Sequence, residues 1–410
     1  MIAHLVRRSA PIAAAPCWRP LLIAAVALLV AACQPAVNRG QPGVASGTAA
    51  PTATPEPAQP SGPPQRVGLL VPLTGNAAAV GLDLASAAEM ALIERGNDRL
   101  ELLPRDTRST QEGAIAAARQ LLDQEDVDVL LGPLFGSSAE RVIDLARPRG
   151  IVVLSFSSQG NIAGNGLYVL GYRPEEQVER VAGFAISRGY ERIAALAPDD
   201  GYGQTAVASL RQTLQAQRGD DLVAVRFYAR DASDVTDKIR ELRAAGSRSG
   251  DLPAFDALLL ADGGTRLRAV ASQLPDHDLT PVDVRMLGTM LWPDDAATLQ
   301  EPSLRGGWYA AVADAATRDF RSRFRRAFGR EPHPLAVLGY DGFLIAADAA
   351  SERSTASQRI TDPRGYQGEA GIIRLRPSGL AEHGLAVFEL TTSGPVVVDP
   401  APVRFVEPTS

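Results

Sequence analysis

Short apolar runs alternate with segments of helical periodicity from residue 66 onward, and this alternation leaves few architectures open to the chain. The first run, RVGLLVPL, is apolar at nearly every position, as in a strand that is buried on both faces. Further strands are predicted at 100–104, 127–132 and 150–156, with helices between them at 84–94, 109–124 and 137–146. Strands that alternate with helices of this length form a parallel sheet with right-handed crossovers.

The same alternation starts again at residue 174. Helices are predicted at 174–189, 203–217, 234–246 and 263–274, and strands at 192–198, 222–228, 255–261 and 284–289. About 345 residues follow Gln65, which is more than one ordinary core holds. We therefore predict an α/β protein with two doubly wound parallel-sheet lobes. Ligands of such sheets bind outside the carboxyl ends of the strands, so facing lobes would form a cleft between them.

The first 32 residues have the features of a secretory signal peptide. Arg7, Arg8 and Arg19 precede an apolar run at 21–32, about twelve residues, which is too short to span a bilayer. The alternative is a buried helix, which the Pro-rich stretch that follows disfavours. The step from Val30 to Cys33 resembles a bacterial lipobox, which implies cleavage before Cys33 and a lipid on its thiol. Two acyl chains would hold such a protein firmly on a membrane.

Residues 33–65 are expected to be a lipidated, disordered linker. The stretch 34–65 holds eight of the 30 prolines and almost no large apolar residue, so it cannot bury a core. Gln34, rather than an aspartate, follows the cysteine, which implies sorting to the outer membrane in bacteria that resemble the enterobacteria. We expect the folded part to lie on the periplasmic side of that membrane.

Charge and motifs disfavour nucleic-acid binding and catalysis. Residues 1–32 carry three arginines and no acid, so 38 basic and 47 acidic residues remain after them, a net charge of −9. A nucleic-acid partner requires a basic footprint instead. The sequence holds no G-x-S-x-G, H-E-x-x-H or P-loop motif. We expect no enzymatic activity, no cofactor and no metal, since PDHD at 275–278 reads as a solvated loop.

Polar residues gather after the predicted strands, where a ligand of this fold would bind. Ser137 begins a helix whose free N–H groups suit an anion or carboxylate, but with Glu140 it also fits a capping box, as Ser109 does with Glu112. Tyr202 lies in a Gly-rich turn, as a lid over a ligand or as local packing. The candidates are Thr74, Gly136, Ser137, Ser138, Ser157, Ser158, Gln159 and Tyr202.

The segment 318–330 carries six arginines around a stripe of three phenylalanines, Phe320, Phe324 and Phe328. This spacing predicts a helix whose stripe is core and whose arginines form a solvated face. The alternative is a basic patch for an acidic partner or for lipid phosphates.

Several segments, taken in order, resemble the type 1 periplasmic binding proteins of the leucine/isoleucine/valine class. They are RVGLLVPLTGNAAAVG, VDVLLGPLFGSS, GIVVLSFSSQ, DDGYGQTA, FRSRFRRAFGREPHPLAVLGYDGF and GEAGIIRLRPSGLAEHGLAVFEL. The resemblance implies two lobes joined by three crossovers, near Gly171, near Tyr309 and between Gly371 and Leu385. The first lobe would comprise 66–170 and 310–370, and the second 171–309 and 371–405.

The resemblance also implies a ligand site, from which this sequence departs. Leucine receptors hold the ligand carboxylate with hydroxyls, and two of those positions fall on Gly136 and Gln159. An acid normally meets the ligand's ammonium, but Thr289 and Met290 stand in that loop here. Tyr202 matches the tyrosine that contacts the ligand side chain. A free amino acid would therefore leave an ammonium buried without a charge partner, which is costly.

The lipid anchor, the linker and the leucine-binding-like part together resemble penicillin-binding protein activators of the LpoA type. This resemblance implies an outer-membrane lipoprotein that contacts and stimulates a peptidoglycan synthase, itself a penicillin-binding protein. We expect no counterpart here of the helical-repeat domain that precedes the module in the enterobacterial activator. The alternative is a receptor that delivers an amino-acid- or amide-like small molecule to an inner-membrane ABC permease.

Overall fold

The computed structural model describes residues 63–246 and 252–405, which lie within one compact unit, Gln59–Ser410. The predicted signal peptide, Cys33 and nearly all of the predicted linker lie outside the described residues. Gln65, which the sequence analysis assigned to the linker, is instead the first residue of strand β1, because its N–H donates to the Arg99 carbonyl at 2.7 Å.

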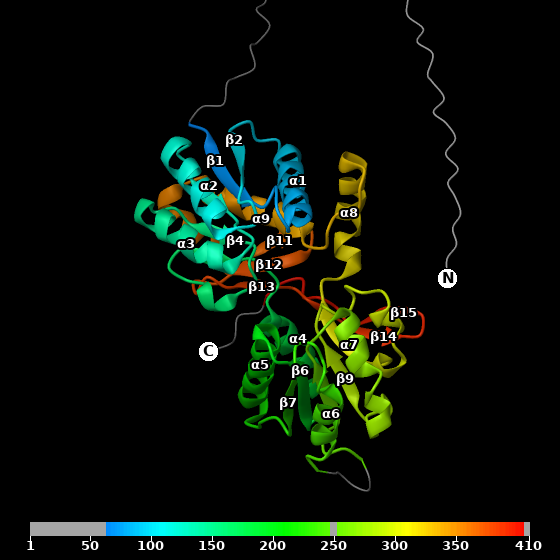
Figure 1. Cartoon of the computed structure of the whole chain (residues 1–410). Helices are drawn as coiled ribbons and strands as arrows, with labels where there is room; N and C mark the ends of the chain where they lie inside the picture. Colours follow the sequence, from blue (N-terminus) through cyan, green and yellow to red (C-terminus); the bar gives the residue numbers. More distant parts are fainter. Residues whose placement is uncertain (1–62, 247–251, 406–410) are drawn as a thin grey trace, which may run out of the picture. The chain divides into compact units, whose positions relative to one another are not determined.

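The first lobe is built on a five-stranded parallel sheet with the order β2-β1-β3-β4-β5 (Figure 1). Alternate residues of β1 serve its two faces: Leu69 packs with α1 and α9, and Leu70 with α2 and α3. The strands are β1 (Gln65–Val71), β2 (Leu100–Asp106), β3 (Val129–Leu131), β4 (Val153–Ser155) and β5 (Leu167–Val169). The helices are α1 (Ala78–Arg95), α2 (Gln111–Gln124), α3 (Gly136–Ala146), α8 (Asp314–Phe328), α9 (Ala336–Ala350) and α10 (Ala356–Ile360).

The second lobe is built on a seven-stranded sheet with the order β15-β14-β10-β9-β8-β6-β7. Its five parallel strands repeat the order of the first sheet, and β14 and β15 add an antiparallel edge. The strands are β6 (Ile193–Pro198), β7 (Val225–Tyr228), β8 (Ala257–Leu260), β9 (Arg285–Gly288), β10 (Trp308–Ala311), β14 (Ala386–Thr391) and β15 (Gly394–Asp399). The helices are α4 (Pro174–Ser187), α5 (Gly201–Arg218), α6 (Val235–Arg243) and α7 (Gly264–Ala271).

The chain passes between the two lobes three times. It leaves the first lobe after β5, returns to it after β10, and leaves it again after a small antiparallel sheet of β11 (Tyr366–Gly368), β12 (Gly371–Leu375) and β13 (Ala381–His383). Two boundaries differ from those expected. Tyr309 lies inside β10, which pairs with β14 through Ala311. Strands β12 and β13 pack with the core of the first lobe, and Leu380 bridges to β5, so the second sheet resumes only at Ala386. The fold itself, two doubly wound lobes with three crossovers, is as predicted.

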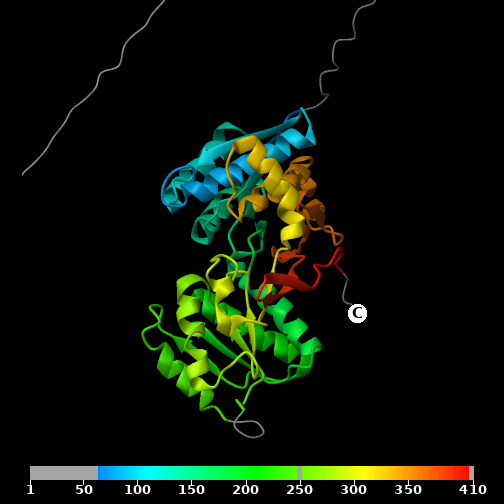
Figure 2. The same ribbon diagram turned by 90° about the vertical axis from the view of Figure 1, so that its right-hand side faces the viewer.

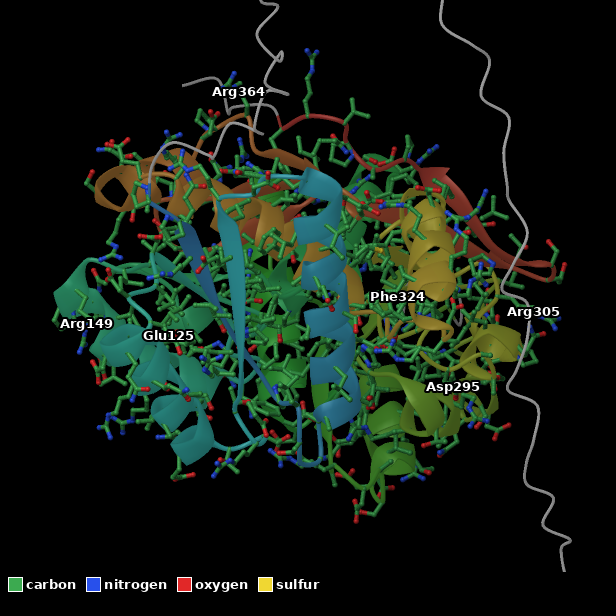
Figure 3. All side chains as sticks on the ribbon, turned by 90° about the horizontal axis from the view of Figure 1, so that it is seen from above. Glu125, Arg149, Asp295, Arg305, Phe324 and Arg364 are labelled. Atoms are coloured by element: carbon green, nitrogen blue, oxygen red, sulfur yellow. The ribbon has the colours of Figure 1, made fainter. Side chains whose placement is uncertain are left out.

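The arginine-rich segment forms α8, which lies beside α1 in Figures 1 and 2. Phe320 and Phe324 are fully buried, and Phe324 is labelled on α8 in Figure 3. Arg323 pairs with Glu94 of α1 and, at 2.7 Å, with Glu369. Two of the three phenylalanines are therefore core, as predicted, Phe328 packs partly buried against that core, and neighbouring carboxylates engage much of the arginine face.

Short 3₁₀ turns complete the described part of the chain, and none of its helices is long and apolar enough to cross a membrane. The turns span Arg147–Arg149, Gly160–Ile162, Leu274–His277, Thr298–Gln300, Pro302–Leu304 and Arg353–Thr355.

Candidate functional site

The carboxyl ends of β3 and β4 bring together three of the predicted residues, Gly136, Ser157 and Gln159. A Cβ built on Gly136 would overlap Oε1 of Gln159 and would lie 3.1 Å from Oγ of Ser157. Ser157 is buried, and its Oγ accepts a hydrogen bond from the Gln159 N–H at 3.1 Å. The Gln159 side chain therefore lies against the start of α3.

Helix α3 begins without a side-chain cap. Its N-cap is Phe135, so the capping box predicted for Ser137 and Glu140 is wrong. Ser137 is exposed, whereas Ser138 is 2% exposed. The first N–H groups of this helix therefore meet no capping side chain, and such groups attract anions. The other predicted box fails as well, because the cap of α2 is Thr110, whose Oγ1 accepts from the Gly113 N–H at 3.0 Å. Ser109 has φ 56° and accepts instead from the Ala77 N–H.

Two of the predicted residues do not join this group. Thr74 is held by Asp106 at the end of β2, to which its N–H and its hydroxyl donate at 3.1 and 2.7 Å. Burial opposes ionisation of Asp106, but the hydrogen bonds from Thr74, Arg108 and Leu73 outweigh it and lower the pKa of this carboxyl. Ser158 is exposed on the loop after β4. Thr74 thus belongs to a loop-to-loop contact within the first lobe.

In the second lobe, Tyr202 and Thr289 bond to each other. The Tyr202 hydroxyl donates to Oγ1 of Thr289 at 2.9 Å, and Thr289 is completely buried. Oε1 of Gln177 accepts from the Met290 N–H at 3.0 Å and lies 3.4 Å from the Tyr202 hydroxyl. Burial raises the pKa of Tyr202 far above its ordinary value. Of the two interpretations of Tyr202, the geometry favours local packing.

Sequence reasoning missed an acid at the neighbouring strand end, Asp262. This residue follows β8 and is 3% exposed. Arg266 donates to both of its carboxylate oxygens through Nε and Nη2, at 2.5 and 2.8 Å, and the Tyr228 hydroxyl also donates to it. Asp262 stands directly after the predicted strand 255–261. The expectation that polar residues after the strands line the site, which selected the serines, would therefore have selected it as well. Its charge is already matched by Arg266, which also lies 3.6 Å from Asp200.

Met290 links the two lobes. Its partly buried side chain packs against the core cluster of the first lobe and against one core cluster of the second. Burial raises the pKa of Asp294, four residues later. His333 of the first lobe is close enough to offset part of this rise. Protein side chains therefore occupy the edge of the second sheet where the resemblance placed an acid. Within 63–246 and 252–405, no three His, Cys, Asp or Glu residues are arranged to hold a metal ion.

The chain matches solved structures of this fold over nearly their whole length. A putative branched-chain amino acid ABC transporter protein from Rhodospirillum rubrum is 19% identical, covering 82% of this chain and 100% of its own, with a TM-score of 0.71. The leucine binding protein LivK from Thermotoga maritima is 17% identical over 82% and 98%, with a TM-score of 0.58. A solute binding protein from R. palustris in complex with 4-hydroxybenzoate is 16% identical over 83% and 96%, with a TM-score of 0.61. At these identities the matches show the fold alone.

Two kinds of curated relative match shorter stretches. The penicillin-binding protein activator LpoA of Vibrio cholerae is 24% identical over 153 residues, 36% of this chain and 25% of the relative. An uncharacterized protein of Rickettsia prowazekii is 22% identical over 176 residues, 43% of this chain and 46% of the relative. The chain thus matches less than half the length of each of these relatives.

A family model described as periplasmic binding protein matches residues 64–394, which include the first sheet, the second sheet as far as the start of β15, and all three passages between the lobes. The structural matches agree with it and confirm the predicted leucine-binding-like type 1 fold. The chain therefore belongs to the periplasmic binding protein family.

Proposed function

We propose that this chain is a lipid-anchored, non-enzymatic periplasmic module that binds and stimulates a peptidoglycan synthase of the penicillin-binding protein class. The observation that carries the proposal is that polar groups of the second lobe already have partners within the protein. Tyr202 donates to Thr289 at the edge where a ligand would bind, and the buried acid Asp262 is paired with Arg266. A free amino acid would find no free carboxylate for its ammonium at Thr289 or Met290.

The match to the activator from Vibrio cholerae supports this proposal, because it rests on sequence and not on the polar groups of the second lobe. The proposal includes an anchor at Cys33 on the periplasmic side of the outer membrane. There the linker would carry the folded part toward a synthase in the inner membrane. Replacement of Cys33 by serine is expected to release the protein from the membrane fraction, which cell fractionation would measure.

A second candidate is a receptor for a small carboxylate solute in an ABC transport system. The uncapped start of α3 beside Ser157 and Gln159 favours it, because the N–H groups at a helix start can donate to a carboxylate. A carboxylic acid without an ammonium, such as the 4-hydroxybenzoate held by the R. palustris protein, would not need an acid in the second lobe. The ligands of this second candidate would therefore be carboxylic acids without an ammonium, and not free amino acids.

Reconstitution of the purified full chain with the host's purified penicillin-binding proteins tests the proposal. We expect one synthase to bind and its glycan polymerisation rate to rise when the chain is added. The same reaction with a leucine-binding receptor of this fold is the control for non-specific crowding. If no synthase binds or accelerates, while a small carboxylate raises the melting temperature of the chain, the receptor function replaces the proposed one.

A further inference from the structure

Helix α1 presents a second apolar stripe beside the residues that it buries in the core, and Ala85 and Leu92 of this stripe are partly buried against that core. Leu82 is 46% exposed and Ile93 is 70% exposed, high values for large apolar side chains. Ala85, Glu89 and Leu92 lie between them, and at about 100° per residue the five positions share an arc of about 100°. We call these five residues the α1 face. Their spacing is that of a helix surface made for packing against another helix.

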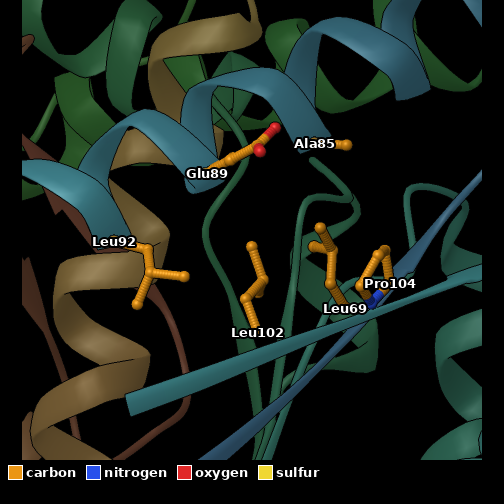
Figure 4. A pocket seen from close by; sticks show the side chains of 6 residues that line it. All are labelled: Leu69, Ala85, Glu89, Leu92, Leu102 and Pro104. Carbon is orange, nitrogen blue, oxygen red and sulfur yellow. The ribbon is translucent and has the colours of Figure 1, made fainter. Parts of the chain in front are cut away.

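A cavity opens beside this face, between α1 and the strands below it (Figure 4). Leu69, Leu102 and Pro104 line it from β1 and β2, and Ala85, Glu89 and Leu92 line it from α1. Its volume is about 210 Å³, less than drug-sized ligands occupy. The cavity therefore suits apolar side chains of a partner better than an independent small molecule.

Glu89 supplies a charge to this surface. The other acids of α1 are engaged: Asp83 pairs with Arg330 at 2.5 Å, and Glu94 pairs with Arg323. Glu89 is exposed and makes no hydrogen bond or ion pair with any residue that the structure describes. A carboxylate that lies in the middle of an apolar stripe favours an occupant that brings a cation to the same place.

Two other occupants fit these observations less well. An added strand would pair with the open edge of β2, but Pro104 lies in that strand and has no N–H to donate. A second copy of the chain would pack its own α1 against this one in an isologous contact. The two Glu89 side chains would then meet near the symmetry axis, because Glu89 lies near the middle of the face, and like charges repel there.

We propose that the α1 face docks an amphipathic helix of another protein, whose apolar stripe enters the cavity and whose lysine or arginine pairs with Glu89. Recognition of this kind uses apolar anchors at helical spacing, with a charge that fixes the register. The inference goes beyond the proposed function and does not depend on it, because it follows from exposure, cavity and charge on α1 alone.

The probe is a pair of synthetic amphipathic peptides of about 20 residues, long enough to be helical. Both carry leucines at heptad spacing; one has a central arginine and the other a central glutamate. Fluorescence anisotropy with the full chain measures their affinities. We expect saturable binding of the arginine peptide, about twofold to fivefold tighter than that of the glutamate peptide. The variant Glu89→Arg should reverse this preference, which a merely structural role of Glu89 would not produce.

Variants at two exposed positions distinguish binding at the α1 face from non-specific hydrophobic binding. Ile93→Asp should weaken both peptides by about fivefold or more, because it places a charge on the apolar stripe. Val282→Asp changes a side chain that is 93% exposed in the second lobe and should leave both affinities unchanged. Absence of saturable binding, equal affinities for the two peptides, or equal effects of these two variants would each overturn the proposal.

Discussion

The carboxyl edges of the two sheets differ, although the two sheets share one strand order. At the first edge, α3 starts without a side-chain cap, and Gln159 merely lies over it. At the second edge, the Tyr202 hydroxyl donates to Thr289, Gln177 accepts from the Met290 N–H, and Asp262 is paired with Arg266. Equal topology therefore does not give equal sites. The first edge keeps donors available, whereas the second uses its polar groups for its own stability.

The largest expected effect comes from the buried pair of the second edge. Asp262→Ala removes the acceptor of Tyr228 and the partner of Arg266, and should lower the free energy of unfolding by about 3 kcal/mol. Urea denaturation of the full chain measures it. The control is Asp144→Ala at an exposed pair with Arg147, which should change stability by less than about 0.5 kcal/mol. Similar losses in both variants would show that the second edge is not built on this pair.

The next effect lies where the small sheet joins the first lobe. Asp341 of α9 is 3% exposed and accepts from the N–H groups of Glu369 and Ala370, at 2.7 and 3.1 Å. Burial raises the pKa of Asp341 to about 6, against about 3.9 in an unfolded chain. The folded state thus keeps a proton that the unfolded chain has lost, so stability falls as pH rises from about 4 to about 6, by at most about 3 kcal/mol.

Asp341→Asn should remove this part of the pH dependence. It should also cost about 1–3 kcal/mol, because the amide offers one acceptor oxygen to two N–H donors. Urea denaturation between pH 4 and pH 7 gives the difference between the wild type and the variant, in which other titrating groups cancel. A difference that does not change with pH would contradict the account.

A smaller effect tests whether Tyr202 is packing or a lid. Tyr202→Phe leaves Oγ1 of Thr289 buried without its 2.9 Å partner and should destabilise the protein by about 1–2 kcal/mol. The double variant with Thr289→Val should recover much of this loss, since both partners are then apolar. A double-mutant cycle from denaturation curves measures the coupling. A Tyr202→Phe variant with unchanged stability and weaker binding of a solute would indicate a lid instead.

The smallest effect is expected at Gly136, the first residue of α3, and Gly203 in the first turn of α5 is the comparison. A Cβ on Gly136 would meet the exposed side chain of Gln159, which is free to swing away, whereas a Cβ on Gly203 would overlap the backbone carbonyl of Pro198. Gly136→Ala should therefore change stability by less than about 0.5 kcal/mol, and Gly203→Ala should cost about 2 kcal/mol. Thermal denaturation distinguishes them. Equal losses would mean that Gln159 is fixed in place at the first edge.

Apolar runs predicted most of the fold, because strands buried on both faces need nearly continuous apolar sequence. β5 (Leu167–Val169) was missed because its apolar run is shorter than the runs 127–132 and 150–156 that revealed β3 and β4. The helix cap at Thr110 was missed because Ser109 beside it fits the same rule, and only the backbone conformation of Ser109 distinguishes them.

Only the parts of the candidate site that are close together in sequence could be predicted. Ser157 and Gln159 are neighbours in sequence, and strand order alone brings them to Gly136. Thr74 bonds to Asp106, which is 32 residues away in the chain, and Tyr202 bonds to Thr289, which is 87 residues away. Such pairs depend on the register of separate strands, which one sequence does not show.

The most direct test of the account is the melting temperature of the full chain with and without saturating leucine. A ligand at 100 times its dissociation constant adds about 2.7 kcal/mol, which raises the melting temperature of a chain of this size by several degrees. The account predicts no change, because Thr289 and Met290 stand where the ammonium would need an acid, and the buried Asp262 is paired with Arg266. A rise of several degrees with leucine would contradict it and would make the chain an amino-acid receptor.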